Sequence, residues 1–418
     1  MDRFEIIGPN RLQGTIRAAG AKNAALPALT AALLAEGTVE LSGLPAVQDI
    51  RTMVRLLEHL GAEVESSGHT LAVTSSGKPV ADDADYALVK TMRASVLVLG
   101  PLVARLGHAR VSLPGGCAIG VRPIDQHLAG LEALGAEVTL EHGYVTARAD
   151  RLVGNRFKFA GRTVTGTENL LMAATLARGT TVLDNCAREP EVVDLARLLT
   201  AMGARIRGAG EDRIEIQGVD SLGGASHRVI ADRIEGGTYL LAAAITGGDV
   251  VLEDCAPGDL AALLEVLERA GCAVDVRPTA VRVSAAGPLA AHSIETAPHP
   301  GFPTDLQAQY MALMTQAQGR SSIHETVFEN RFQHAPELVR MGAAIQVDGG
   351  YAWVEGPAPL SGAHVMATDL RASACLVLAG LVAEGRTVVH RIYHLDRGYE
   401  GMEEKLRGLG ARVERASE

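Results

Sequence analysis

The chain has 418 residues, too many for a single ordinary hydrophobic core, so its length predicts two domains. Hydrophobic residues make up 47% of the chain but aromatic residues only 3%, which indicates a core of Ala, Leu, Val and Ile in closely packed helices and sheets. The net charge of −10 argues against a general affinity for nucleic acid or for acidic membrane surfaces, so any basic site must be local.

The N-terminal stretch MDRFEIIGPNRLQG contains no apolar segment of the kind found in secretory signals. The longest apolar runs elsewhere in the chain are too short to span a bilayer. Five cysteines without any C-x-x-C pair are typical of free thiols in a reducing compartment, and they give no sign of a zinc knuckle. These features predict a cytoplasmic protein that neither inserts into a membrane nor binds nucleic acid.

A phrase typical of a helix end recurs six times along the chain, as HLGAEV, ALGAEV, AMGARI, RAGCAV, RMGAAI and GLGARV. The glycines of successive phrases are 74, 68, 68, 71 and 68 residues apart, and so steady an interval predicts a repeated structural unit. Apolar residues recur at helical spacing before the glycines of the first four copies, whereas the fifth and sixth copies depart from this pattern at Arg331 and Glu403. Each glycine is therefore placed to end a helix ahead of a strand. The six glycines are Gly61, Gly135, Gly203, Gly271, Gly342 and Gly410.

Each copy predicts the order helix, strand, loop, helix, strand and hairpin strand. The sixth copy stops at LGARVERASE without its final strand, whereas the N-terminal FEIIGPNRLQGTIRAAG is comparable with WVEGPAPLSGAHVMA at the end of the fifth copy. We therefore expect the N-terminal segment to complete the sixth copy. Three copies per domain give one domain over 22–230 and another over 1–21 plus 231–418, with a ligand-binding cleft between the two lobes.

Equivalent positions in the six copies differ in charge at the first turn of the leading helix, which precedes the first strand of each copy. Copies one, two and six have the cations Lys22, Arg93 and Arg371, and copies three, four and five have Glu168, Glu235 and Asp305. The loop before the second helix adds Arg122 in copy two and Arg397 in copy six. Helix N-termini favour anions, and arginines bind phosphate or carboxylate through two hydrogen bonds. The pattern thus indicates a small polyanionic substrate, the alternative being solvated charges at helix starts.

Asp305 is an acid at a position that is cationic in three other copies, and two prolines precede it in HPGFPTDLQAQ. Such a carboxylate suits a general base for a hydroxyl, and it equally suits a plain N-cap; Asp369 in MATDLRAS has the same two interpretations. His127 and His334 occupy the same position in copies two and five. They are either core histidines at the edge of a cleft or ligand-binding residues.

Cys117 lies in the glycine-rich stretch LPGGCAIGVRP, five residues before Arg122. Nearby cations would stabilise its thiolate, and a loop free to swing would carry the thiol to a substrate when the site closes. The other four cysteines are expected to be structural. Common motifs of phosphate binding, zinc proteases and serine hydrolases are absent from the sequence.

The sixfold unit together with LPGGCAIGVRP, GAKNA, TMRAS, FPTDLQAQ and DLRAS resembles the UDP-N-acetylglucosamine 1-carboxyvinyltransferase family of enolpyruvyl transferases, over essentially the whole chain. The resemblance implies an α/β fold, an inside-out α/β barrel in each of two domains, with three βαβαββ units apiece. It also implies transfer of the enolpyruvyl group of phosphoenolpyruvate to the 3′-hydroxyl of UDP-N-acetylglucosamine, the step that opens peptidoglycan synthesis. That reaction needs no metal and no cofactor.

The resemblance also implies roles for single residues. Cys117 would be the general acid at the enol methylene, able to form a phosphoenolpyruvate adduct and to be alkylated by fosfomycin, and Asp305 would take the hydroxyl proton. Lys22, Arg122 and Arg397 would hold phosphoenolpyruvate, with Asn23, Asp369 and Arg371 nearby. The other substrate-binding positions implied are Arg93, Pro123, Ile124, Asp125, Gln126, Arg162, Thr163, Val164, Thr165, Val327 and Arg331.

Two alternatives remain open from the sequence. One is a transferase like 5-enolpyruvylshikimate-3-phosphate synthase, with the same fold and donor but another acceptor. The other is a non-catalytic repeat protein that only binds a nucleotide sugar.

Overall fold

The computed structural model describes residues 2–75, 83–84, 86–89, 92–113 and 124–417. These residues form two compact units, and the chain passes between them at Ala19–Gly20 and at Ile230–Ala231. We call the described residues of 20–230 the central unit, and those of 2–19 and 231–417 the terminal unit. Each unit contains three four-stranded sheets.

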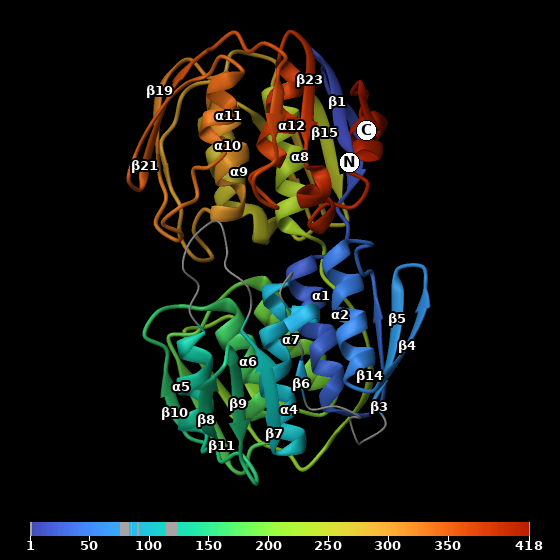
Figure 1. The fold of residues 1–418 in the computed structure, drawn as a ribbon. Helices are drawn as coiled ribbons and strands as arrows, with labels where there is room; N and C mark the ends of the chain where they lie inside the picture. Colours follow the sequence, from blue (N-terminus) through green and yellow to red (C-terminus); the bar gives the residue numbers. More distant parts are fainter. Residues whose placement is uncertain (1, 76–82, 85, 90–91, 114–123, 418) are drawn as a thin grey trace. The chain divides into compact units, whose positions relative to one another are not determined.

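The central unit holds the first three copies of the repeat (Figure 1). Its sheets have the strand orders β14-β3-β5-β4, β6-β7-β9-β8 and β10-β11-β13-β12. The strands are β3 (Ala35–Ser42), β4 (Ala62–Ser67), β5 (Thr70–Ser75), β6 (Asp83–Ala84), β7 (His108–Ser112), β8 (Glu137–Glu141), β9 (Tyr144–Arg148), β10 (Arg156–Lys158), β11 (Thr180–Asp184), β12 (Arg205–Arg207), β13 (Arg213–Gln217) and β14 (Leu222–Arg228). The helices are α1 (Lys22–Ala31), η1 (Ala32–Leu34), α2 (Gln48–His59), α3 (Tyr86–Val89), η2 (Arg93–Val98), α4 (Leu99–Leu106), α5 (Asp125–Ala133), α6 (Val164–Ala174) and α7 (Pro190–Ala201), where η denotes a 3₁₀ helix.

The terminal unit holds the other three copies, in sheets of order β16-β17-β15-β2, β18-β19-β21-β20 and β22-β23-β1-β24. Its strands are β1 (Arg3–Gly8), β2 (Gln13–Arg17), β15 (Asp249–Glu253), β16 (Ala273–Arg277), β17 (Ala280–Ser284), β18 (Ile294–Glu295), β19 (Gly319–His324), β20 (Ala344–Asp348), β21 (Tyr351–Gly356), β22 (His364–Met366), β23 (Gly385–His390) and β24 (Val413–Ala416). Its helices are α8 (Arg233–Ile245), η3 (Pro257–Leu260), α9 (Ala261–Arg269), η4 (Thr304–Leu306), α10 (Gln307–Met314), α11 (Ala335–Arg340), α12 (Ala374–Val382), η5 (Ile392–Arg397) and α13 (Met402–Gly408).

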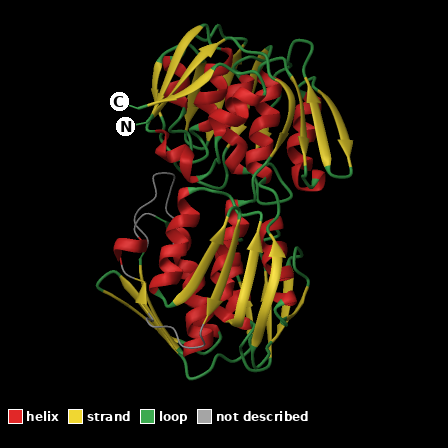
Figure 2. Ribbon diagram, turned by 90° about the vertical axis from the view of Figure 1, so that its right-hand side faces the viewer, coloured by secondary structure: helices red, strands yellow, loops and turns green. Residues whose placement is uncertain are grey.

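In each unit the leading helices lie inside and the sheets lie outside (Figure 2). Helices α8, α10 and α12 contact one another in the terminal unit, and α1, α4 and α6 form the inner helices of the central unit. Residues on every side of α8 and α12 are buried, as expected for helices that are apolar all round. Their many alanines and glycines allow close approach, which accounts for a core with so few aromatic side chains.

The six repeat glycines end their helices as predicted. Their φ angles lie between 90° and 110°, a region that is strained for residues with a side chain. The positions are Gly61, Gly135, Gly203, Gly271, Gly342 and Gly410.

The N-terminal segment completes the sixth copy, as predicted. Strand β1 lies between β23 and β24 and is antiparallel to both, with Phe4 opposite Val389 and Arg415. The copies also exchange edge strands: β2 precedes the first copy but pairs with β15 of the fourth, and β14 precedes the fourth copy but pairs with β3 of the first.

Two details of the predicted helix starts were wrong. Glu168 lies in the second turn of α6, because that helix begins at Val164, with Thr163 as its N-cap. Arg371 precedes α12, which begins at Ala374. In addition, the leading helices of copies two and five begin as the 3₁₀ helices η2 and η4.

Candidate functional site

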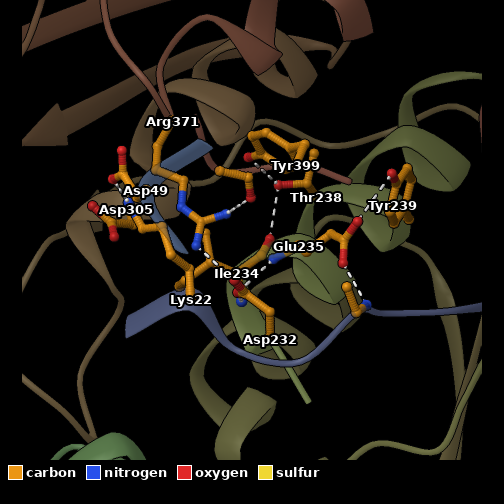
Figure 3. A network of polar contacts seen from close by, with 12 residues as sticks. Lys22, Asp49, Asp232, Ile234, Glu235, Thr238, Tyr239, Asp305, Arg371 and Tyr399 are labelled. Carbon is orange, nitrogen blue, oxygen red and sulfur yellow. Dashed lines mark hydrogen bonds and ion pairs between the residues drawn. The ribbon is translucent and has the colours of Figure 1, made fainter. Parts of the chain in front are cut away.

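Arg371 in the terminal unit is a buried cation held by an acid and a backbone carbonyl. The residue is 2% exposed, and its guanidinium donates from Nη2 to Asp232 Oδ2 at 2.7 Å and from Nη1 to the carbonyl oxygen of Gly398 at 2.9 Å (Figure 3). The guanidinium also lies over the ring of Tyr399, 5.1 Å from its centroid. Burial lowers the pKa of Arg371, but nearby groups, first among them the Asp232 carboxylate, together more than offset this, so its pKa lies above the ordinary value. The site therefore contains a fixed positive charge.

Asp232 holds Arg371 because it is itself held by a helix. It is the N-cap of α8, and its Oδ1 accepts hydrogen bonds from the backbone N–H groups of Ile234 and Glu235, both at 2.9 Å. The other oxygen, Oδ2, is then directed to the guanidinium.

Asp305 in η4 contacts a second buried cation. Arg331 is 4% exposed and donates from Nη2 to Asp305 Oδ1 at 2.9 Å, whereas the Asp305 side chain remains 26% exposed. Burial lowers the pKa of Arg331, but the carboxylates of Asp305 and Asp369 more than offset it and raise its pKa. A carboxylate with one oxygen on a fixed cation and part of its surface accessible is suited to accepting a proton from a bound hydroxyl.

The backbone around Asp305 is tied to Tyr399 through one amide. Gln309 Nε2 lies within hydrogen-bond distance of three oxygens, the carbonyl oxygen of Asp305 at 3.0 Å, Thr238 Oγ1 at 3.1 Å and Tyr399 Oη at 3.1 Å, which share its two protons. Thr238 and Tyr399 are themselves 3.0 Å apart through their hydroxyls (Figure 3). The network positions Asp305 and the aromatic ring that supports Arg371 in one rigid assembly.

Val327 and Asp369 have local structural roles in their loops. The N–H of Val327 donates to Glu325 Oε1 at 2.8 Å, and the buried Glu325 also accepts from Thr304 Oγ1. Asp369 Oδ1 accepts from the N–H groups of Arg371 and Ala372, both at 2.8 Å, as a capping residue does. The remaining predicted cation of this unit, Arg397, ends η5 and is half-buried.

His334 is completely buried, and burial lowers its pKa to about 4 against the opposing charge of Asp369. Of the two interpretations that the sequence left open, a neutral core histidine describes it.

Lys22 in the central unit is the first residue of α1, with Asn23 next to it. Lys22 is 6% exposed, and its Nζ lies 3.2 Å from Asp49 Oδ2 in the first turn of α2 (Figure 3). Asp49 therefore balances the buried charge and orients the ammonium group.

The two predicted nucleotide-sugar segments of the central unit contact each other. Ile124, Asp125 and Gln126 lie at the start of α5. Arg162 and Thr163 lead into α6, and Val164 and Thr165 are its first two residues. Gln126 Oε1 accepts from the N–H of Gly161 at 3.2 Å, and Thr165 Oγ1 lies 3.3 Å from His127 Nε2.

The two predicted arginines of this region have different surroundings. Arg162 makes an exposed ion pair with Asp212 at 3.0 Å. Arg93 opens η2 close enough to His127 for its charge to lower the pKa of the imidazole, after the larger effect of burial.

Three predicted residues, Cys117, Arg122 and Pro123, lie outside the described residues. The other cysteines are free thiols, and burial raises the pKa of each: Cys186, Cys255, Cys272 and Cys375. The part of the chain that is described contains no cluster of His, Cys, Asp and Glu able to hold a metal ion. None of its helices has the length and apolarity to cross a bilayer.

The sequence did not identify the acids that hold the cations. Asp49 lies 27 residues from Lys22, and Asp232 lies 139 residues from Arg371. The one signal in the sequence was that Asp49 is an acid in the first turn of a helix. Glu325, which accepts from the N–H of Val327 two residues away, was not identified either. The sequence analysis also missed Tyr399. The available signal was that aromatic residues are rare in this chain, at 3% of its residues, so that each of them merits attention.

A family model described as EPSP synthase (3-phosphoshikimate 1-carboxyvinyltransferase) matches residues 6–406. Five relatives that are 56–58% identical are named UDP-N-acetylglucosamine 1-carboxyvinyltransferase. The one from Koribacter versatilis is 58% identical and the alignment covers 100% of this chain and 97% of that protein. The chain belongs to the enolpyruvyl transferase family. The resemblance found in the sequence is confirmed, and the chain is a transferase.

Solved structures of enolpyruvyl transferases share this fold, which confirms the predicted fold class. The enolpyruvyl transferase NikO from Streptomyces tendae has a TM-score of 0.90 and 29% identity, covering 100% of this chain and 99% of that one. An EPSP synthase from Acinetobacter baumannii has a TM-score of 0.77 and 19% identity, with 100% of both chains covered. The latter likeness concerns the fold alone.

Proposed function

We propose that this enolpyruvyl transferase joins the enolpyruvyl group of phosphoenolpyruvate to the 3′-hydroxyl of UDP-N-acetylglucosamine and releases phosphate. The observation that carries the proposal is the full-length similarity, at 56–58% identity, to five proteins named for that activity. The LPGGCAIGVRP and GAKNA segments support the same acceptor.

In the proposed reaction, addition is followed by elimination. The sugar oxygen bonds to C2 of phosphoenolpyruvate as its proton passes to Asp305, and C3 gains a proton from Cys117. The Cys117 thiolate left by this step then takes a proton from C3, which restores the double bond as the C2–O bond to phosphate breaks. The phosphate leaves with the proton that Asp305 accepted. Atoms and charges balance without an oxidant or reductant.

The buried cations suit the charges of this donor. We assign Lys22, Arg122 and Arg397 to the phosphate and carboxylate of phosphoenolpyruvate, with Asn23 and Arg371 as neighbours. Lys22 and Arg371 are each fixed by an acid before a substrate arrives, so little side-chain entropy is lost on binding.

We also place this reaction in the cytoplasm, as a supply of precursor for peptidoglycan and hence for cell shape and division. Cys117 would be alkylated by fosfomycin there, because a thiolate is the nucleophile that opens an epoxide.

The test is phosphate release from phosphoenolpyruvate with UDP-N-acetylglucosamine or with 3-phosphoshikimate as acceptor. We expect turnover with the nucleotide sugar only. Asp305→Ala should lower kcat by about 10²–10⁴-fold, the range for loss of a general base, and Cys117→Ala should also impair turnover. Asp275→Ala, which removes an exposed acid paired with Arg277, is the matched control and should leave kcat unchanged. Turnover with 3-phosphoshikimate instead, or undiminished turnover by Asp305→Ala, would contradict the proposal.

A further inference from the structure

His127 of the central unit belongs to a buried chain of hydrogen bonds that the proposed chemistry does not use. It is 2% exposed on α5 and lies next to Asn169 of α6, which is 0% exposed. The half-buried Thr165, one turn before Asn169, is at the other side of the imidazole. Thr165 is also one of the residues assigned above to the nucleotide sugar.

The orientation of the Asn169 amide is fixed by a backbone donor. The N–H of Gly100 donates to Asn169 Oδ1 at 2.7 Å. Because a peptide N–H can only donate, the Asn169 atom that faces it must be the amide oxygen. A side chain at position 100 would place its Cβ 2.1 Å from this oxygen, so only glycine permits the contact. Asn169 Nδ2 is therefore the atom that faces the carbonyl oxygen of Val96, at 3.2 Å, and His127 Nδ1, at 2.9 Å.

This orientation determines the tautomer of His127. Because the Asn169 amide nitrogen can only donate, His127 Nδ1 must accept, and the proton of the neutral ring lies on Nε2. A second proton on Nδ1 would set two donors against each other at 2.9 Å. Burial, together with the charge of Arg93, lowers the pKa of His127 to about 4, in agreement with a neutral ring.

The tautomer of His127 in turn determines whether the Thr165 hydroxyl is available as a hydrogen-bond donor. His127 Nε2–H donates to Thr165 Oγ1 at 3.3 Å, so one lone pair of the hydroxyl is occupied. The hydroxyl proton is left to donate to another acceptor, and the part-exposed position of Thr165 allows that acceptor to be a ligand atom.

We infer that His127 is a positioning residue that presents the Thr165 hydroxyl as a hydrogen-bond donor to an acceptor oxygen of the nucleotide sugar. The inference rests on the proposed function, because that function supplies the ligand. It predicts that His127 acts on nucleotide-sugar binding through Thr165 and has little effect on phosphoenolpyruvate.

The experiment is a double-mutant cycle on the full-length enzyme, with KM measured separately for UDP-N-acetylglucosamine and for phosphoenolpyruvate. Thr165→Val should raise the KM for the nucleotide sugar about tenfold, as for loss of a hydrogen bond to a charged group. His127→Phe should raise it about 5–10-fold alone and have no further effect in the Thr165→Val background. His127→Gln retains a donor near the Nε2 position and should stay within about twofold of wild type, and so should Thr165→Ser.

Equal effects of His127→Phe in both backgrounds, or an equal rise in the KM for phosphoenolpyruvate, would overturn the inference while leaving the proposed function intact. A wild-type enzyme without turnover of UDP-N-acetylglucosamine would overturn both. A second measurement needs no folded Phe variant: ¹⁵N NMR of histidine-labelled wild type should show the Nε2–H tautomer for His127 at neutral pH, assigned by comparison with His127→Gln. A proton on Nδ1 would reject the inference.

Discussion

Two buried glutamates that the repeat aligned with each other, Glu168 and Glu235, have different surroundings. Both are at most 1% exposed, and burial raises the pKa of each. Glu235 accepts from Lys405 Nζ and from the N–H of Ala19, both at 2.6 Å. Glu168 Oε1 has no hydrogen-bond partner among the described residues. The negative charge of Glu235 is thus compensated by Lys405 and a backbone N–H, whereas ionisation of the buried Glu168 costs free energy.

Glu168→Gln should remove a pH-dependent loss of stability. The folded state holds the Glu168 proton to higher pH than the unfolded state, whose pKa is near 4.5, so wild-type stability falls as pH rises above that value. The variant lacks this fall, and its advantage in Tm should be larger at pH 8 than at pH 5 by scanning calorimetry. An equal difference at the two pH values would contradict the expectation.

The matched variant Glu235→Gln should behave in the opposite way. It breaks the ion pair with Lys405, and we expect a loss of about 1–3 kcal/mol in the free energy of unfolding at neutral pH. Urea unfolding measures this loss. A variant as stable as wild type would show that the ion pair contributes nothing net.

The thiols should differ sharply in reactivity. Burial raises the pKa of Cys186 to about 12 and of Cys272 to about 11, and it raises the values of Cys255 and Cys375 as well. Brief treatment of the native enzyme with iodoacetamide at neutral pH should therefore label Cys117 alone, as peptide mass spectrometry would show. Cys117→Ser should abolish the labelling; label on Cys186 in native protein would contradict the prediction.

At the scale of single elements, the helix ends depend on glycine conformation. Gly410, with φ of 95°, follows α13, whereas Gly408 is the last residue of that helix. A Cβ at Gly410 would come no closer than 3.9 Å to a neighbour, and one at Gly408 would have none within 4 Å. Differences between substitutions at these positions will therefore report backbone strain alone.

Gly410→Ala should cost about 1–2 kcal/mol in the free energy of unfolding, because alanine is strained at positive φ. Gly408→Ala, two residues earlier in helical backbone, should be neutral or stabilise by up to about 1 kcal/mol. Chemical denaturation of the two variants under one set of conditions makes the comparison. Equal losses would show that packing, and not φ, determines the cost.

Periodicity predicted most of the elements, because each copy must bury one apolar stripe against its own sheet. The strands TVEL and DVVLE, for example, lie within β3 and β15. The exchange of β2 and β14 between copies was not predicted. Each is an edge strand, and no local pattern shows which parallel neighbour an edge strand will pair with.

The site was predictable in part for the same reason. Lys22, Asp305 and Arg371 could be found because the repeat placed them at equivalent positions, at or shortly before the start of a helix. Their partners lie on other segments, 27 residues away for Asp49 and 139 for Asp232. A distant pairing of this kind is determined by how segments meet in three dimensions, and one sequence contains no direct record of it.

At the scale of the whole molecule, the two ends of the chain belong to one sheet. Strand β1 is inserted between β23 and β24, with Arg3 opposite Ala416. Phe4 and Ile6 on this strand are 1% and 0% exposed. The terminal unit therefore depends on its first residues as much as on its last.

Deletion of residues 2–8 should unfold the terminal unit, since two strands lose their common partner and the buried faces of Phe4 and Ile6 are lost. A circular permutant that joins the ends through a short glycine linker and opens at the exposed β16–β17 turn keeps every strand, and should fold and turn over substrate. Circular dichroism and phosphate release test both proteins. A folded, active deletion variant would contradict the dependence on β1.

The same strand pairing determines the order in which the two units can fold during translation. All strands of the central unit have been translated once β14 emerges, so that unit can fold while synthesis continues. β1 is the first strand of the described residues to be made, yet its partners β23 and β24 are the last two of them. The apolar side chains of β1 must therefore wait, unpaired and open to chaperones, while residues 9–384 are synthesised.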